Sequence, residues 1–267
     1  MYNILCPTDF SPNSEFAVEY AIHICNSLGA KLNFISSYKV PSVAGSLRSL
    51  DDKIKDALHE DLAYFVNKFK YLITTGIEPG IIVVEGNTTT SILNYAQISK
   101  IDLIIMGTKG SSNISNVIMG SITKKFFENS QIPVLAIPYI SKEQISGNKI
   151  LLSLDSKGIN NDHSINLLRA LKKMPNTELN VFHVGSIGEK MELAENSGKL
   201  HDIVDQIIEV EGSDPVAEIK RYAENNDIGI VAMVGRKHSF WERLFRESNT
   251  TAELFATNIP ILMLPDE

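Results

Sequence analysis

Glycines and hydroxyl side chains cluster after one apolar run of the sequence, at spacings that can do chemistry. Residues 102–106 are followed by Gly107, two further residues and Gly110, and then by nine residues and Gly120-Ser121. Glycine lets the backbone approach a ligand closely, and unpaired N–H groups at a helix start offer donors and positive potential to phosphate. The pattern fits a phosphate-binding loop, to which Ser121 and Thr123 can add hydroxyl donors, and it fits equally a loop whose glycines only form turns.

Alternating strands and helices surround this loop in the first half of the chain. Apolar runs predict strands at residues 2–7, 31–38, 81–84, 101–106 and 134–137, and helical spacing predicts helices at 11–28, 50–72, 88–99 and 121–129. Continuous apolar strands separated by helices indicate a parallel sheet that is covered on both faces. The glycine loop follows the carboxyl end of a strand, where open parallel sheets bind their ligands.

The second half of the 267-residue chain repeats this order. Residues 84–86 recur at 210–212, residues 95–96 at 222–223, and residues 132–138 at 259–265, which are offsets of 126, 127 and 127. The repeat predicts two tandem α/β domains, at residues 1–140 and 147–267, with a linker around Pro138 to Gly147. The second copy is too short for the long helix, so residues 189–200 form either a shorter helix or a mobile loop.

Three segments of the first half carry a resemblance to a known family. Pro7-Thr8-Asp9, residues 105–121 with their glycine spacing, and residues 132–138 closely resemble the universal stress protein family. The resemblance covers nearly the whole chain, as two family domains in tandem. It implies two adenine-nucleotide alpha-hydrolase-like (Rossmann-like) domains, each a five-stranded, mostly parallel sheet with helices on both faces.

In the nucleotide-binding branch of that family, the same glycine pattern contacts ribose and phosphates, which implies ATP or AMP as ligand. Gly107 and Gly110 would line ribose and phosphate. The phosphates would be held by Gly120, Ser121, Ile122 and Thr123. The adenine or ribose would lie near Asp9, with Pro7 and Thr8 beside it, against the backbone of Ile35 and with Met106 closing the pocket.

Two polar residues of this predicted site have an alternative role. Asp9 precedes a helix, so it can cap that helix or satisfy a turn instead of contacting the ligand. It could also help to hold Mg²⁺ on a bound nucleotide. Lys109 could meet phosphate charge or be solvated in a polar loop.

The second copy lacks part of the glycine pattern. Gly235 matches Gly107, but His238 takes the place of Gly110 and Glu247 that of Gly120, with Ser248 matching Ser121. A carboxylate where phosphate should lie would repel it, so this copy should not bind ATP in the family manner. Basic residues gather near Trp241 and could form an anion site, an interaction surface or a solvated loop: Arg236, Lys237, Arg243 and Arg246.

Composition and charge exclude several other classes. A net charge of −7 and a pI near 5.4 argue against broad binding of nucleic acid or anionic membranes. No apolar run is long enough to span a bilayer and no signal peptide is recognised, so we expect a cytoplasmic protein. Cys6 and Cys25 are predicted to pack as small apolar residues, and no metal centre is expected from protein ligands alone.

These patterns favour a nucleotide-binding regulatory or stress-response module that signals to a protein partner the sequence does not identify. A slow ATPase or nucleotidyl-transfer enzyme is an alternative, although no Gly-x4-Gly-Lys-Ser/Thr motif or nucleophile–base pair is recognised. An interaction protein without ligand is another. The apolar strands at 134–137 and 261–264 should pair within the chain as a pseudo-dimer, because in the resembling family the last strand pairs between subunits. A homodimer of chains is also compatible with this arrangement.

Overall fold

The computed structural model describes residues 1–40, 47–108, 119–139, 148–155, 157–185, 199–236 and 258–266. The first half contains β1 (Asn3–Pro7), α1 (Pro12–Leu28), β2 (Lys31–Tyr38), α2 (Leu47–Asn67), the 3-10 helix η1 (Lys70–Leu72), β3 (Gly80–Glu85), α3 (Thr88–Ile98), β4 (Leu103–Gly107), α4 (Ser121–Asn129) and β5 (Val134–Ile137). The second half contains β6 (Lys149–Ser153), α5 (Asp162–Lys172), β7 (Glu178–Gly185), β8 (Gln206–Glu211), α7 (Pro215–Asn225), β9 (Ile228–Gly235) and β10 (Ile261–Pro265).

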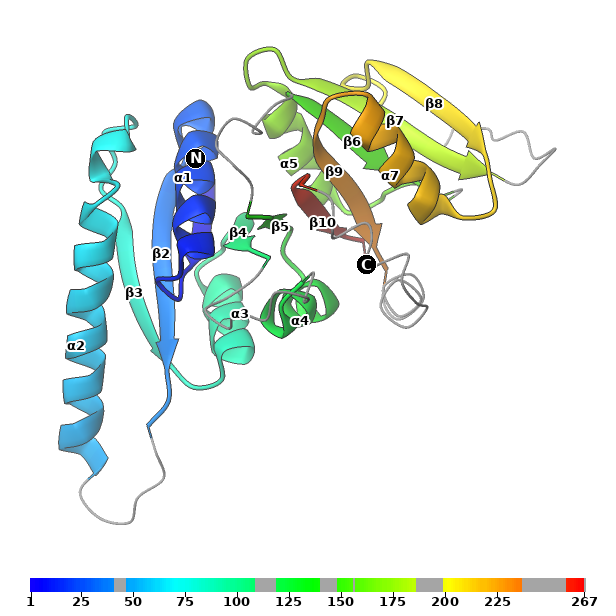
Figure 1. The fold of residues 1–267 in the computed structure, drawn as a ribbon. Coiled ribbons are helices and arrows are strands. Elements are labelled where there is room, and N and C mark those ends of the chain that lie inside the picture. Colours follow the sequence, from blue (N-terminus) through cyan, green and yellow to red (C-terminus); the bar gives the residue numbers. More distant parts are fainter. Residues whose placement is uncertain are drawn as a thin grey trace.

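The strands of both halves form a single ten-stranded sheet in the order β3-β2-β1-β4-β5-β10-β9-β6-β7-β8 (Figure 1). Within each half all neighbouring strands are parallel. The halves meet where β5 and β10 pair antiparallel, with Leu135 opposite Leu262. This confirms the expected pairing of the two last strands, and it leaves neither of them as an exposed edge.

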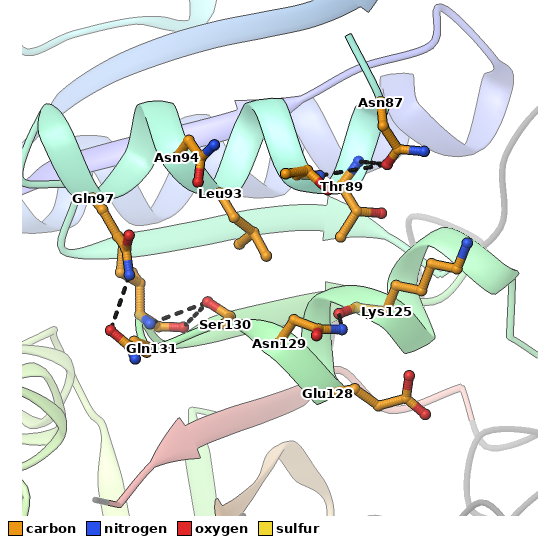
Figure 2. Close-up of a pocket in the computed structure, with 12 residues that line it drawn as sticks. Asn87, Thr89, Leu93, Asn94, Gln97, Lys125, Glu128, Asn129, Ser130 and Gln131 are labelled. Carbon is orange, nitrogen blue, oxygen red and sulfur yellow. Dashed lines mark hydrogen bonds between the residues drawn. The ribbon is translucent and has the colours of Figure 1, made fainter.

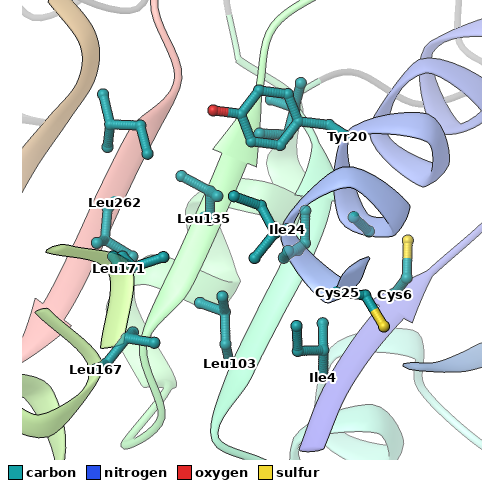
Figure 3. Packing of buried hydrophobic residues seen from close by; sticks show 14 of the residues in the cluster. Ile4, Cys6, Tyr20, Ile24, Cys25, Leu103, Leu135, Leu167, Leu171 and Leu262 are labelled. Carbon is teal, nitrogen blue, oxygen red and sulfur yellow. The ribbon is translucent and has the colours of Figure 1, made fainter. Parts of the chain in front are cut away.

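Buried side chains fill both faces of the sheet. One cluster joins α1, α2 and α5 to the sheet and runs across the junction of the halves, where Tyr20 and Ile24 of α1 lie near Leu135 and Leu262 (Figure 3). The opposite face packs against α3, α4 and α7. Apolar residues at successive strand positions are therefore explained by helices on both faces, as the sequence predicts.

Both cysteines lie inside this core. Cys6 and Cys25 are free thiols that are at most 1% exposed. Burial raises the pKa of the Cys6 thiol to about 12 and that of Cys25 to about 11. Their predicted packing as small apolar residues is confirmed.

One helix boundary predicted from the sequence is wrong. The long helix was expected to reach residue 72, but α2 ends at Asn67 and is followed by η1. Phe65 and Phe69 stack edge to face with ring centroids 5.4 Å apart, and both are buried. Apolar residues therefore continue at helical spacing beyond the end of α2, because Phe69 is buried although the backbone there is no longer α-helical.

Candidate functional site

The sheet order places a switch point between β1 and β4. After β1 the chain winds outward through β2 and β3, and then returns to add β4 and β5 on the other side of β1. Parallel sheets of this kind bind ligands in the crevice beyond the carboxyl ends of the two strands at such a point. Pro7 ends β1 and Gly107 ends β4, so the two predicted site segments lie at neighbouring strand ends.

The segment after β1 is held by its own hydrogen bonds. Thr8 is buried; its N–H donates to Ile35 O at 3.0 Å and its hydroxyl donates to Ser14 Oγ at 3.0 Å. Asp9 is exposed, and its Oδ1 accepts from Ser11 N at 3.1 Å and Ser11 Oγ at 2.5 Å. Ser11 in turn caps α1. Asp9 thus supports the turn into α1, the alternative role considered for it.

Ile35 and Met106 lie deeper than the other predicted site residues. Ile35 is fully buried and Met106 is nearly so, both in the core on the α3 and α4 face. Only backbone atoms of Ile35 can therefore reach a ligand, and its carbonyl oxygen already accepts the Thr8 amide. These two residues shape the floor beneath the strand ends.

Gly107 is closely packed against the first turn of α1. A Cβ added at this position would lie 2.7 Å from Asn13 Nδ2 and 3.2 Å from the Asn13 carbonyl oxygen. The first turn of α1 thus approaches the end of β4 as closely as backbone allows. Asn13 is buried there, a contact that no sequence pattern had indicated.

The start of α4 presents unused backbone donors. Gly120 occupies the N-cap position without a side-chain cap, and its own N–H donates to Thr108 O at 2.7 Å. Ser121, Ile122 and Thr123 follow as the first three helical residues, and their N–H groups find no acceptor among the residues that the structure describes. Three orphan amides at a helix start are a ready anion site.

The hydroxyl of Thr123 has a structural role. It is 2% exposed and donates to Gly107 O at 3.0 Å, with Thr108 O at 3.3 Å. A hydroxyl has one proton to donate, and the Thr123 hydroxyl uses it in a hydrogen bond that links α4 to the end of β4. The remaining contribution of Thr123 to an anion is its backbone N–H. Ser121 and Ile122 are exposed beside it.

Several predicted positions lie outside the described residues. In the first half these are Lys109 and Gly110, and most of the proposed linker after Tyr139. In the second half they include His238, Trp241, Glu247 and Ser248, with Lys237, Arg243 and Arg246. The alternative of a helix or loop at 189–200 also falls largely in this part of the chain.

The second half has its own switch point, between β6 and β9, and a charged side chain bridges the strand ends there. Leu154 N donates to Phe182 O at 3.0 Å, matching the Thr8–Ile35 bond, so Asp155 corresponds to Asp9. Arg236 follows Gly235 at the end of β9 and reaches Asp155 Oδ2 with Nη1 at 2.5 Å. The guanidinium also donates to the carbonyl oxygen of Gly158.

A second carboxylate completes this network. Asp266 follows β10, and its side chain is 5% exposed. Its Oδ2 accepts from Arg236 Nε at 3.1 Å, while its Oδ1 accepts from the N–H groups of Asn160 and Asn161 at 2.7 and 2.8 Å. Asp266 was not singled out in the sequence. The available signal was that Arg236 and Asp266 directly follow β9 and β10 and that Asp155 lies two residues after β6, three strands that are neighbours in the sheet.

A separate polar groove of about 610 Å³ lies between α3 and α4 (Figure 2). Asn87, Thr89, Asn94 and Gln97 line it from the α3 side, and Lys125 and Asn129 from α4. Gln97 Nε2 donates to Gln131 Oε1 at 2.9 Å near one end. The groove contains none of the predicted nucleotide-site residues.

Among the described residues, no group of three or more His, Cys, Asp or Glu side chains could hold a metal ion. None of the helices in that part of the chain is both long and apolar enough to cross a membrane.

Comparisons with known proteins agree with this architecture. The model of the universal stress protein family matches residues 1–138. Universal stress protein MJ0531 of Methanocaldococcus jannaschii is 29% identical over 142 residues, which are 52% of this chain and 84% of that protein. Universal stress protein MJ0577 of the same organism is 28% identical over 151 residues, covering 50% of this chain and 93% of that protein.

One solved structure is similar along nearly the whole chain. The crystal structure of a universal stress protein from Archaeoglobus fulgidus superposes with a TM-score of 0.69 at 18% identity. The match covers 99% of this chain and 96% of that one. At this identity the match establishes the α/β fold of both halves.

Proposed function

Because this chain belongs to the universal stress protein family, whose model matches residues 1–138, we propose that its first half binds an adenine nucleotide, ATP or AMP. The observation that carries the proposal is the start of α4, where the N–H groups of Ser121, Ile122 and Thr123 have no described acceptor beside the β1–β4 switch point. Phosphate oxygens would accept from these amides.

The remaining predicted residues fit around this phosphate position. Gly107 and Gly110 would line ribose and phosphate, with Gly120 fixing the helix start through its bond to Thr108. Asp9 is exposed near the expected ribose or adenine and could meet a Mg²⁺ ion brought by ATP. Pro7, Thr8, Ile35 and Met106 would form the base of the pocket.

We propose one nucleotide per chain. We assign residues 1–140 and 147–267 to two tandem domains that act as an intrachain pseudo-dimer, and we place the nucleotide at the switch point of the first. Arg236 occupies the corresponding place in the second, held by Asp155 and Asp266. The nucleotide would regulate a partner protein in the cytoplasm, as a stress-response module.

Replacing Gly120 with Asp tests the proposal at its central observation. Gly120 has φ −66° and ψ 150°, which any residue can adopt, and an Asp at this N-cap would accept from the amides of Ile122 or Thr123. It would therefore compete with phosphate and repel it. We expect the Kd for ATP and AMP, measured by calorimetry, to rise by about tenfold or more. The free energy of unfolding should not fall.

Gly120→Ala is the matched control, because it adds a side chain without a competing oxygen. Because alanine places no carboxylate near the phosphate, the Kd for ATP and AMP should stay within about threefold of that of the unmodified protein, with a stoichiometry near one. Absence of ATP and AMP binding to the unmodified protein, or equal binding by the Asp variant, would contradict the proposal.

A further inference from the structure

A cavity of about 470 Å³ lies between the two halves of the molecule. Its first-half wall comes from α1 and Leu72, and its second-half wall from the starts of β6 and β9 and from Met174 and Thr177. Small-molecule sites occur preferentially between domains and span about 300–1,000 Å³. The cavity shares no residue with the proposed nucleotide site.

The cavity exists because the halves approach each other unequally. On one side α5 contacts the first half directly: Tyr2 Oη donates to Asn166 O at 2.9 Å, and His163 Nε2 lies 3.1 Å from Asp102 O. On the other side α1 faces the second half, and the space between them is not filled. The halves leave a hollow on this side of the junction.

The walls are mainly apolar. Six aliphatic or thioether side chains line the cavity: Ile22, Ile24, Leu72, Ile150, Met174 and Ile230. Tyr20 adds its ring, which lies over the junction of β5 and β10 with its hydroxyl directed toward the second half (Figure 3). The four isoleucines are at most 5% exposed, whereas Leu72 and Met174 are partly exposed, so an apolar occupant would bury mainly these two side chains.

Two hydroxyl side chains of the lining have no hydrogen-bond partner among the described residues. The Tyr20 hydroxyl makes no hydrogen bond to any residue in the described ranges. Thr177 is 6% exposed, and its Oγ1 is buried without a partner in the same part of the chain. Because the Thr177 oxygen is enclosed by protein atoms, the Tyr20 hydroxyl is the one of the two that a ligand in the cavity could meet.

One charge in the lining is uncompensated. Lys149, at the start of β6, forms no ion pair with the residues that the structure describes. Glu19 also lines the cavity but already has an interaction of its own. His23 stands exposed beside it on α1. The cavity lining therefore has one positive charge, on Lys149, that lacks a counter-ion among the described residues.

We propose that this cavity binds a small amphipathic carboxylate, with its apolar body between the halves and its carboxylate on the Lys149 ammonium. The hydroxyl of Tyr20 adds a donor for a carboxylate oxygen. Such a ligand would contact both halves at once and stabilise their packing by mass action.

Octanoate is a suitable probe, with 1-octanol as its uncharged counterpart. We expect saturable binding of octanoate to the full chain by calorimetry, a raised melting temperature, and weaker binding of octanol. The His23 ring protons should shift in NMR spectra, whereas those of His59, exposed on α2, should not.

Lys149→Met removes the charge but keeps an unbranched apolar stem. It should raise the octanoate Kd about tenfold or more and leave octanol binding unchanged. Lys31→Met, at the start of β2 outside the cavity, should leave both unchanged. His23→Trp would narrow the cavity edge from an exposed position and should weaken both probes.

Three results would overturn the proposal: no saturable octanoate binding, equal affinity in the Lys149 and Lys31 variants, or ligand shifts at His59 without shifts at His23. Circular dichroism and melting of each variant separate a lost ligand contact from a lost fold.

Discussion

At the scale of single residues, Gly107 shows how one position can serve two purposes. Its place after a buried strand suggested close approach of a nucleotide, but its nearest neighbour in the structure is the side chain of Asn13. Thr123 similarly donates its hydroxyl to Gly107 O rather than keeping it for phosphate. The residue types were recognised from the sequence, and the contacts that fix them came from the packing of α1 and α4 on β4.

Gly107→Ala should therefore destabilise the protein even without nucleotide. The new Cβ would lie 2.7 Å from Asn13 Nδ2, and we expect the free energy of unfolding in urea to fall by about 1–3 kcal/mol. Adding Asn13→Ala should recover part of this loss, since the atoms that clash are removed. If the double variant is as unstable as the sum of the two single variants, the proposed contact is not the cause.

At the scale of elements, most boundaries follow from local signals. Ser11 and Gly29 delimit α1 as expected, with Gly29 in the left-handed region at φ 59°. The predicted limits of β2, α4 and β5 agree with the structure. The end of α2 was missed because buried phenylalanines continue the apolar spacing beyond the helix. Local sequence patterns indicate which residues are buried. They indicate less reliably whether the backbone forms α-helical or 3-10 hydrogen bonds.

Arg236 joins three elements of the second half, the ends of β9 and β10 and the segment after β6. Arg236→Met keeps the apolar stem but leaves the buried Asp266 carboxylate without its cation. We expect the free energy of unfolding to fall by about 2–3 kcal/mol in urea titrations, because removing one partner of a buried pair strands the other charge.

Arg221→Met is the control for that change. Arg221 pairs with Glu218 on the surface of α7, where its side chain is 68% exposed. Its loss should cost no more than about 1 kcal/mol. Equal effects of the two substitutions would show that the Arg236 network contributes no more than a surface pair.

At the scale of the whole molecule, the antiparallel pairing of β5 and β10 makes two similar halves into one sheet. Leu135 and Leu262 face each other there, fully buried, in a cluster that continues into both halves. The first half alone would expose β5 as an apolar edge, which is an open template for pairing.

Residues 1–139 expressed alone should therefore form a dimer through two copies of β5. Light scattering coupled to size-exclusion chromatography should give about twice the mass of one fragment, since an isologous pair satisfies both edges. The full-length chain, whose β5 is already paired with β10, is the reference. A folded monomeric fragment would contradict this expectation.

The sequence by itself determined the alternation of strands and helices, the duplicated order of elements and the glycine-rich segment before α4. These features are local or periodic, so residue type and spacing are enough to specify them. Only the tertiary structure decided that Asn13 packs closely against Gly107, that Arg236 bridges the strand ends at the second switch point, and that a cavity remains between α1 and the second half. Each of these depends on contacts between residues far apart in the chain, whose distances are set by the packing of helices on a common sheet.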